Sequence, residues 1–407
     1  MTRGTSDAHH RPARPSPGWV IALWVAKIAG SVLIVVLGLV VLGAFFPRLL
    51  GLGVIGAALS GASTWLGLAA LIGLGVAVWL LLRRRGIWRG IMTGVAAVTV
   101  IGCAVITTQL VSLGAQYGVA INPFGLTVST SAPDDVVSYG EHDGKSLNVS
   151  IWRPTTGSAE NAPVAFITHG GGWVNGSPAE MQEIIPALTN AGWLVIGPAY
   201  TLATPRSHTV NFVEDQIGCA MAWTQANAAS YGGDPSTFVS MGDSAGGNLA
   251  INTAYRTASG DLACDRIGAM PDVDAVAVIF PAVNPVALWN DSVTGGVHPG
   301  QTFLEQYVGG SPTEFPKEYK AVASAPHVTP ASPPTLILQG TNDHLVQAHA
   351  VADFARTSRA AGVDTTYVSV PHGEHVFQSS PLGSQLYRSI TLKWLEEQGL
   401  TPSTSNK

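Results

Sequence analysis

The sequence predicts an α/β fold: a doubly wound, mostly parallel sheet with helices on both faces, preceded by about three transmembrane helices. Three observations predict it. The first part of the 407-residue chain is unusually apolar, which indicates membrane spans. Beyond residue 135, short β-branched runs alternate with helical stretches, as in a parallel sheet. Small polar motifs follow several of these runs, at the edge where such sheets carry their chemistry.

Charge divides the chain into two parts. Residues 1–115 contain nine Lys or Arg and one acidic residue, whereas residues 116–407 contain 12 basic and 25 acidic residues. Binding to nucleic acid depends on a basic surface that neutralises phosphates. The acidic second part therefore argues against nucleic acid as a partner.

Three apolar runs, residues 18–46, 64–82 and 90–114, are long enough to cross ~30 Å of hydrocarbon at about 1.5 Å per residue. A cleaved signal peptide explains the first run poorly, because the run is long and two more follow. Residues 49–60 are short, apolar and glycine-rich. They fit a re-entrant segment, a surface segment or an extension of the second span. We thus expect a membrane region over residues 18–115, with the lipid bilayer as a partner.

Basic residues in the short loops predict the orientation of these spans. Three arginines lie in the tail of residues 1–17, and four lie between the second and third spans. Arg48 is the one basic residue between the first and second. We therefore expect a multi-pass protein of the cell membrane, with residues 1–17 in the cytoplasm and the large domain outside it.

The cysteines fit this orientation. Cys103 lies in a span, whereas Cys219 and Cys264 lie in the large domain, where an oxidising environment would preserve a disulfide. We expect these two to be bridged. Two buried free thiols are the alternative, because bridging depends on a Cα separation that the sequence does not supply.

Predicted strands and helices alternate along the large domain, residues 130–398. The strands cover residues 146–154, 163–170, 193–200, 237–242, 275–280, 334–340 and 365–370, and the helices cover residues 178–191, 210–231, 246–258, 345–362 and 383–398. Residues 284–330 are rich in Pro and Gly with little regular pattern, and we expect them to form a cap that determines specificity. Residues 399–407 are expected to be a flexible tail.

A nucleophile, an acid and a base each follow a different predicted strand. Ser244 stands in GDSAGG at a tight strand-to-helix corner, Asp343 follows residues 335–339, and His375 follows residues 366–370. A serine hydroxyl becomes a good nucleophile when an imidazole accepts its proton, and a carboxylate fixes the tautomer of that imidazole. Carboxyl ends of parallel strands share one edge, so we expect these side chains to meet there.

A glycine loop accompanies this set of residues. The motif HGGGW at residues 169–173 follows another predicted strand. Glycine lets the backbone approach a reacting group closely, and backbone N–H groups stabilise the oxyanion of a tetrahedral intermediate. The pattern therefore favours acyl transfer through a serine.

These motifs resemble the α/β-hydrolase fold, in its hormone-sensitive-lipase-like esterase branch. The resemblance rests on HGGGW, GDSAGGNLA, TNDHLV and GEHVF, and it covers roughly residues 130–398. It implies Ser244 as the nucleophile, Asp343 as the acid and His375 as the base, with oxyanion-hole donors from Gly171, Gly172 and Ala245. His372 and Asp364 are weaker alternatives for the base and the acid.

Other residues have expected supporting roles. Four aromatic residues could line an acyl or alcohol pocket or could equally belong to the core: Trp173, Tyr200, Trp289 and Phe303. We expect His169 to position the glycine loop, Asp243 to hold the serine corner through hydrogen bonds, and Glu374 to be a solvated turn charge. No spaced set of ligands predicts a metal site, and no cofactor is expected.

The sequence thus predicts a membrane-anchored serine esterase that acts on acyl esters through an acyl-enzyme. A deacetylase or acyltransferase acting on a cell-envelope glycan or lipid is an alternative, because it uses the same site. A hydrolase-like membrane scaffold without activity is a second alternative. The sequence leaves the acyl chain, the alcohol and the oligomeric state open.

Overall fold

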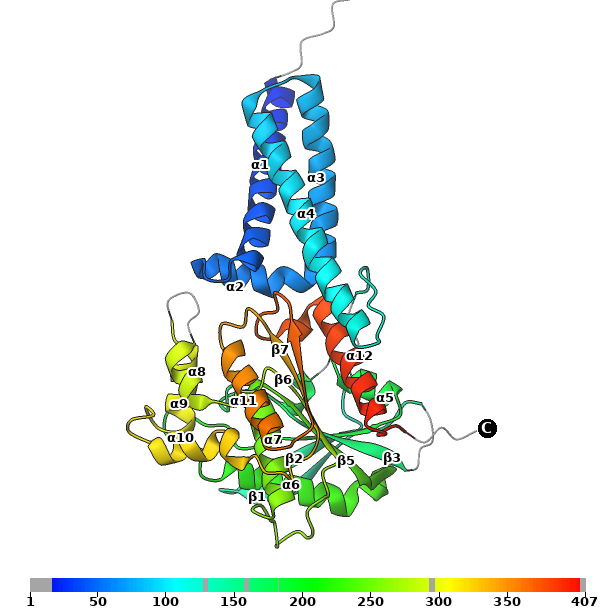
Figure 1. Ribbon diagram of the computed structural model, residues 1–407, viewed down its shortest axis with the longest axis vertical. Coiled ribbons are helices and arrows are strands. Elements are labelled where there is room, and N and C mark those ends of the chain that lie inside the picture. Colours follow the sequence, from blue (N-terminus) through cyan, green and yellow to red (C-terminus); the bar gives the residue numbers. More distant parts are fainter. Residues whose placement is uncertain (1–16, 127–130, 157–160, 182, 293–296, 403–407) are drawn as a thin grey trace, which may run out of the picture.

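The computed structural model describes residues 17–402, apart from residues 127–130, 157–160, 182 and 293–296. The predicted cytoplasmic tail, most of the predicted C-terminal tail and part of the predicted cap lie outside the described residues. A long helical bundle stands on one end of an α/β domain (Figure 1).

Three helices form the bundle: α1 Pro17–Phe45, α3 Ser63–Arg83 and α4 Ile87–Gln116. Each contains an apolar stretch long enough to cross a membrane. Large apolar side chains remain exposed on these helices; Ile72 is 72% exposed and Leu82 81%. Helices that face lipid present such side chains outward, so the bundle has the surface of a membrane region.

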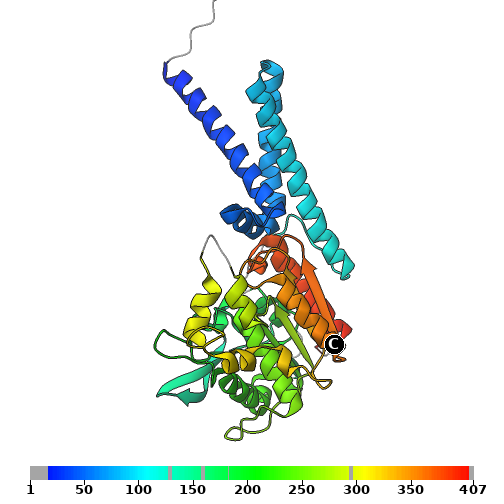
Figure 2. The same ribbon diagram turned by 60° about the vertical axis from the view of Figure 1, so that its left-hand side comes forward.

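Residues 49–60 form a separate short helix. Helix α2 (Leu50–Leu59) is followed by the 3-10 turn η1 (Ser60–Ala62), which leads directly into α3. Figures 1 and 2 show α2 lying across the end of the bundle that meets the α/β domain. Of the three sequence-based alternatives, the surface segment describes this arrangement best.

Eight strands form one sheet in the order β1-β2-β4-β3-β5-β6-β7-β8. Strands β1 and β2, and β2 and β4, are antiparallel, and the other neighbouring pairs are parallel. This confirms the mostly parallel sheet. The strands are β1 Asp135–His142, β2 Lys145–Trp152, β3 Ala162–Thr168, β4 Leu194–Pro198, β5 Gly233–Asp243, β6 Ala275–Ile279, β7 Thr335–Gly340 and β8 Thr365–Val370.

Helices cover both faces of the sheet, as predicted. One core packs α6 (Val213–Asn227), α7 (Ser244–Ser259) and α11 (Ala348–Ala360) on the first face. The second core packs α5 (Ile185–Asn190) and α12 (Pro381–Glu397). Central strands such as β3 and β6 are buried along their whole length because both faces are covered.

Helix α4 belongs to the bundle and to the α/β domain at once. Its side chains Ile106, Leu110 and Leu113 join the second core, beside α12. The bundle is therefore packed onto the α/β domain along an apolar surface rather than joined to it by a loose linker.

The predicted cap contains more regular structure than its sequence pattern indicated. Three short helices, α8 Pro285–Asp291, α9 Pro299–Tyr307 and α10 Pro316–Val322, lie within residues 284–330. Each has proline at its start, a position where the missing N–H is harmless. The predicted helix over residues 178–191 was too long: it is a 3-10 turn, η2 (Pro178–Glu180), and the short helix α5.

Cys219 on α6 and Cys264, which follows α7, are joined by a disulfide. Cys103 on α4 is buried and free. The bridge ties α6 to the segment between α7 and β6, on the sheet face opposite α12.

Candidate active site

Ser244 lies at the corner where β5 ends and α7 begins. Its φ of +51° is uncommon for a residue with a side chain, and it reflects a sharp strand-to-helix turn. Neighbouring glycines permit the turn. A Cβ at Gly246 would lie 2.2 Å from the carbonyl oxygen of Thr168, and one at Gly242 would lie 2.5 Å from the carbonyl oxygen of Gly246. The small residues around Ser244 are thus required by close backbone contacts.

Ser244, His375 and Asp343 form one chain of hydrogen bonds. The Nε2 atom of His375 lies 3.0 Å from Ser244 Oγ, and its Nδ1 atom lies 2.9 Å from Asp343 Oδ2. The other oxygen of Asp343 accepts from the backbone N–H groups of Leu345 and Val346. These bonds fix the carboxylate toward the imidazole, so that Asp343 can orient the ring and stabilise its charged form when it accepts the serine proton.

The two weaker alternatives lie elsewhere. Asp364 stands before β8, at the opposite edge of the sheet, where its backbone carbonyl accepts from Thr335. The ring of His372 contacts the carbonyl oxygen of Ala44 and the side chain of Gln109. Neither residue is hydrogen-bonded to Ser244.

Opposing effects determine the pKa of His375. Burial disfavours its charged form, but the charge and hydrogen bond of Asp343, with further contributions from Asp243 and Glu374, outweigh burial. The net effect raises the pKa above its usual 6.5. The ring of Phe280 lies 4.4 Å from that of His375, centroid to centroid.

The predicted oxyanion loop leaves β3 beside the serine corner. Gly171 and Gly172 have φ of +103° and +61°, a left-handed conformation that favours glycine. A Cβ at Gly171 would lie 2.1 Å from the carbonyl oxygen of Asn175. Thr168 pairs with Gly242 across β3 and β5, so the loop and the corner emerge side by side. Ala245, the third predicted donor, is buried in the first turn of α7.

A hydrogen bond joins the loop to the corner. The backbone N–H of Gly170 donates to Asp243 Oδ1 at 2.7 Å. Burial raises the pKa of Asp243 to about 6, although this hydrogen bond acts in the opposite direction. Asp243 therefore has the position expected of a residue that holds the serine corner.

His169 and Tyr200 support the loop from the protein interior. The ring of His169 contacts the carbonyl oxygen of Gly170 at 2.8 Å and stacks on Tyr200 at 4.4 Å. Tyr200 donates to the carbonyl oxygens of His169 and Gly170. Burial lowers the pKa of His169 to about 4, so its ring is neutral and is suited to positioning.

The other three aromatic candidates occupy different places. Phe303 of α9 lies against the loop, since a Cβ at Gly172 would be 2.6 Å from its ring. Trp173 is buried and stacks on Tyr307 of α9 at 4.5 Å. Trp289 of α8 packs edge-on against Tyr319 within the cap. Phe303 thus lies against the glycine loop, and hydrogen bonds join Tyr200 to it. Trp173 is the last residue of that loop.

Sequence reasoning was wrong about Glu374. This side chain is 7% exposed and accepts from both the backbone N–H and the Nδ1 of His344. The hydrogen bond with Glu374 is the largest contribution that raises the pKa of His344 to about 9, so His344 is charged at neutral pH. The two residues immediately adjoin Asp343 and His375. This adjacency was visible in the sequence, but the pairing across two loops was not.

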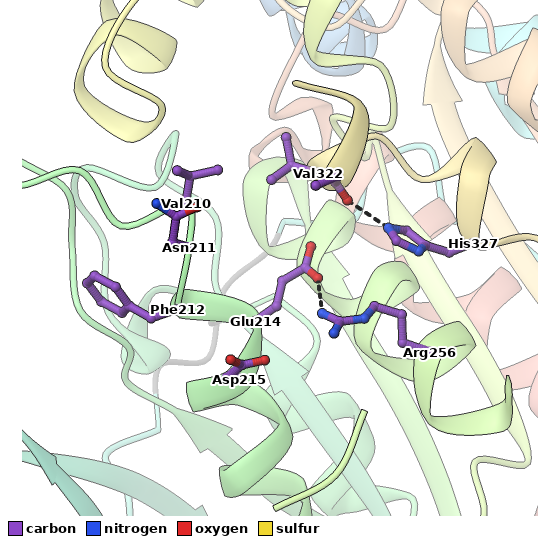
Figure 3. A pocket seen from close by; sticks show the side chains of 9 residues that line it. Val210, Asn211, Phe212, Glu214, Asp215, Arg256, Val322 and His327 are labelled. Carbon is purple, nitrogen blue, oxygen red and sulfur yellow. Dashed lines mark hydrogen bonds and ion pairs between the residues drawn. The ribbon is translucent and has the colours of Figure 1, made fainter. Parts of the chain in front are cut away.

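A separate cavity of about 340 Å³ lies away from Ser244, Asp343 and His375. Residues from the start of α6, from α7 and from α10 line it. Figure 3 shows its ion pair, in which Arg256 lies 2.7 Å from Glu214. None of the predicted site residues lines this cavity. Among the residues that the structure describes, no group of three His, Cys, Asp or Glu side chains could hold a metal ion.

Comparisons with known proteins agree with the fold of the α/β domain. Residues 149–357 match the family model BD-FAE. "Probable carboxylic ester hydrolase LipM" of Mycobacterium tuberculosis is 29% identical over 250 residues, which are 60% of this chain and 56% of that protein. "Esterase LipC" of the same organism is 26% identical over 67% of this chain and 70% of its own length. The chain thus spans just over half the length of LipM.

Solved structures share the fold. That of Thermogutta terrifontis esterase 2 phosphonylated by sarin has a TM-score of 0.56 and 22% identity. It covers 68% of this chain and 100% of its own. The matched part corresponds in extent to the α/β domain.

Proposed function

Because the chain belongs to the BD-FAE family, we propose that it is a membrane-anchored serine hydrolase of carboxylic esters. One observation carries the proposal: the continuous hydrogen-bond chain from Asp343 through His375 to Ser244, beside a glycine loop. Relatives named as esterases support the same reaction class.

In the proposed mechanism, Ser244 Oγ attacks the ester carbonyl while His375 Nε2 accepts its proton. Asp343 keeps Nδ1 protonated and stabilises the imidazolium. Backbone N–H groups of Gly171, Gly172 and Ala245 stabilise the oxyanion, at ~3–4 kcal/mol per donor in comparable sites.

The intermediate then collapses. His375 gives its proton to the departing alcohol, and Ser244 remains acylated. Water, activated by His375, attacks the acyl group and releases the acid. A deacetylase would carry out the same steps on an acetyl ester, with water as the second reactant. An acyltransferase would differ only in the last step, where an alcohol takes the place of water and accepts the acyl group from Ser244.

The proposal places the α/β domain outside the cytoplasm. Arginines concentrate at the predicted cytoplasmic ends of the spans, and the Cys219–Cys264 disulfide suits an oxidising compartment.

A fluorophosphonate probe tests the catalytic serine against the scaffold alternative. We expect the full-length protein to be labelled, and labelling to vanish in Ser244→Ala, because the probe reacts with an activated hydroxyl. Ser138→Ala is the matched control, since Ser138 is exposed on β1, and it should be labelled like the wild type. Ser244→Ala should also lower kcat/KM for a soluble ester by at least about 10³-fold. Unlabelled but folded wild type would favour the scaffold.

A further inference from the structure

We propose that the ester substrate is an amphiphile resident in the bilayer, presented to Ser244 at the membrane surface. This inference rests on the function proposed above and names its substrate class. Three features of the structure carry it: the way the bundle is attached, the surface of α2, and the exposed apolar residues Val376 and Val286 of the α/β domain.

The bundle is attached at the catalytic edge of the sheet. The carbonyl oxygen of Ala44, near the end of α1, accepts from Asn342 Nδ2 at 2.8 Å and from His372 Nδ1 at 2.9 Å. The carbonyl oxygen of Pro47 accepts from His344 Nε2 at 2.8 Å. Asn342 and His344 flank Asp343 in the chain, and His372 stands three residues before His375. The end of α1 and the residue Pro47 therefore contact the two loops that carry Asp343 and His375.

Consequently, the membrane surface and the catalytic edge face each other. Figure 1 shows the loops after β7 and β8 directly below the bundle, and Figure 2 shows the same contact from another side. With α1, α3 and α4 in a bilayer, the headgroup layer lies at the level of α2 and of these loops.

Helix α2 has an uncharged, apolar outer face of the kind that contacts lipid. Its sequence, LGLGVIGAAL, contains no polar or charged side chain. Gly53, Gly56 and Ala57 are buried, whereas Ile55 is 49% exposed and Leu59 39%. An apolar face without charges, lying across a membrane bundle, is covered by acyl chains when the bundle is inserted.

Two apolar residues of the α/β domain are also exposed, one of them beside the catalytic histidine. Val376, next to His375, is 50% exposed and has φ of +58°, an uncommon conformation for a β-branched residue. Val286 at the start of α8 is 39% exposed. In both ribbon views α2 extends over the same side of the α/β domain as α8 (Figures 1 and 2). An ester that approaches Ser244 from the leaflet surface would therefore meet an exposed apolar side chain directly beside His375.

The test compares two esters with the full-length protein reconstituted in vesicles. One is a water-soluble short-chain ester, and the other is a fluorogenic diacyl glycerolipid held in the bilayer. Diluting the glycerolipid with a non-hydrolysable ether lipid, at constant bulk concentration, should lower its rate of hydrolysis in proportion to its mole fraction. A rate that follows bulk concentration alone, or no hydrolysis of the glycerolipid beside normal hydrolysis of the soluble ester, would overturn the inference.

A charge on α2 provides the second arm. Ile55→Glu should lower hydrolysis of the glycerolipid about tenfold or more, because burying one exposed aliphatic side chain in acyl chains is worth about that factor. It should change hydrolysis of the soluble ester less than about twofold. Val136→Glu is the matched control: Val136 is 59% exposed on β1, far from the bundle, and should leave both rates unchanged.

The outcomes separate the two proposals. If Ile55→Glu also loses the soluble ester, Ile55→Ser replaces it with the same expectation. Equal effects of Ile55→Ser on both esters, or none on the glycerolipid, would contradict the inference while leaving esterase activity intact. Failure of the folded wild type to hydrolyse the soluble ester would instead reject the proposed function.

Discussion

The ionisation of His375 determines the pH at which this site can work. Only the neutral imidazole accepts a proton from Ser244, and the pKa of His375 is raised because Asp343, Asp243 and Glu374 together outweigh burial. The protonated, inactive form therefore persists to higher pH than for an ordinary histidine. We expect kcat/KM for a soluble ester to fall as the pH is lowered, with an apparent pKa above 6.5.

Glu374→Gln tests whether the charge of Glu374 helps to raise the pKa of His375. Removing this negative charge lowers the pKa of His375, so the acid limb of the pH profile should move to lower pH. Glu141→Gln removes an exposed carboxylate on β1 and should leave the limb in place. A limb that stays unchanged in Glu374→Gln would mean that the charge of Glu374 does not act on the base.

For single residues, the sequence predicts which side chains belong to the site better than it predicts which side chains are hydrogen-bonded to one another. Ser244, Asp343 and His375 stand in short motifs whose order indicates one sheet edge, and the structure brings them together. Glu374 was expected to be solvated because its neighbours in the chain are those of a turn. Its actual partner, His344, lies 30 residues away on another loop, and no local pattern reports that pairing.

Among the elements, α2 makes a close backbone contact with the end of α1, which in turn contacts the loops after β7 and β8. A Cβ at Gly56 would lie 2.2 Å from the backbone nitrogen of Ala44, so Gly56→Ala must displace α2 or the end of α1. The same end of α1 holds Asn342 and His372. We expect Gly56→Ala to lower both the thermal midpoint and kcat for a soluble ester.

Gly51→Ala is the matched control for this prediction. Gly51 lies in the same helix, but a Cβ there would meet nothing within 4 Å. The substitution should leave the midpoint and kcat unchanged or slightly raise the midpoint, since alanine favours helix. Equal behaviour of the two variants would show that the contact between α1 and α2 does not position the catalytic loops.

The buried parallel strands were predictable because they are continuous β-branched runs bounded by glycine or polar motifs. Strand β1 was not predicted. It is an edge strand with much exposed surface, and its sequence, DVVSYGEH, shows a weak apolar signal. The cap helices were also missed, because helices of seven to nine residues are too short to show a clear period of 3.6. Local sequence pattern therefore identifies neither β1 nor these helices.

The whole molecule joins two regions that the sequence describes separately. Charge and hydropathy predicted the membrane region, and motifs predicted the α/β domain. Their mutual arrangement depends on contacts such as Asn342 with Ala44, 298 residues apart in the chain, and on the apolar surface that α4 shares with α12. No periodicity within either region indicates these contacts.

Orientation of the whole molecule yields the last prediction. In the orientation proposed above, three spans with the arginine-rich ends inside would leave the α/β domain outside, where Cys219 and Cys264 can be oxidised. Protease added to intact cells should digest the chain beyond residue 116 and spare a tag at the N-terminus. In protein from the same cells, a maleimide polymer should modify Cys219 and Cys264 only after unfolding and reduction. Free thiols at both positions, together with a protected α/β domain, would reverse the orientation, because the cytoplasm keeps such thiols reduced.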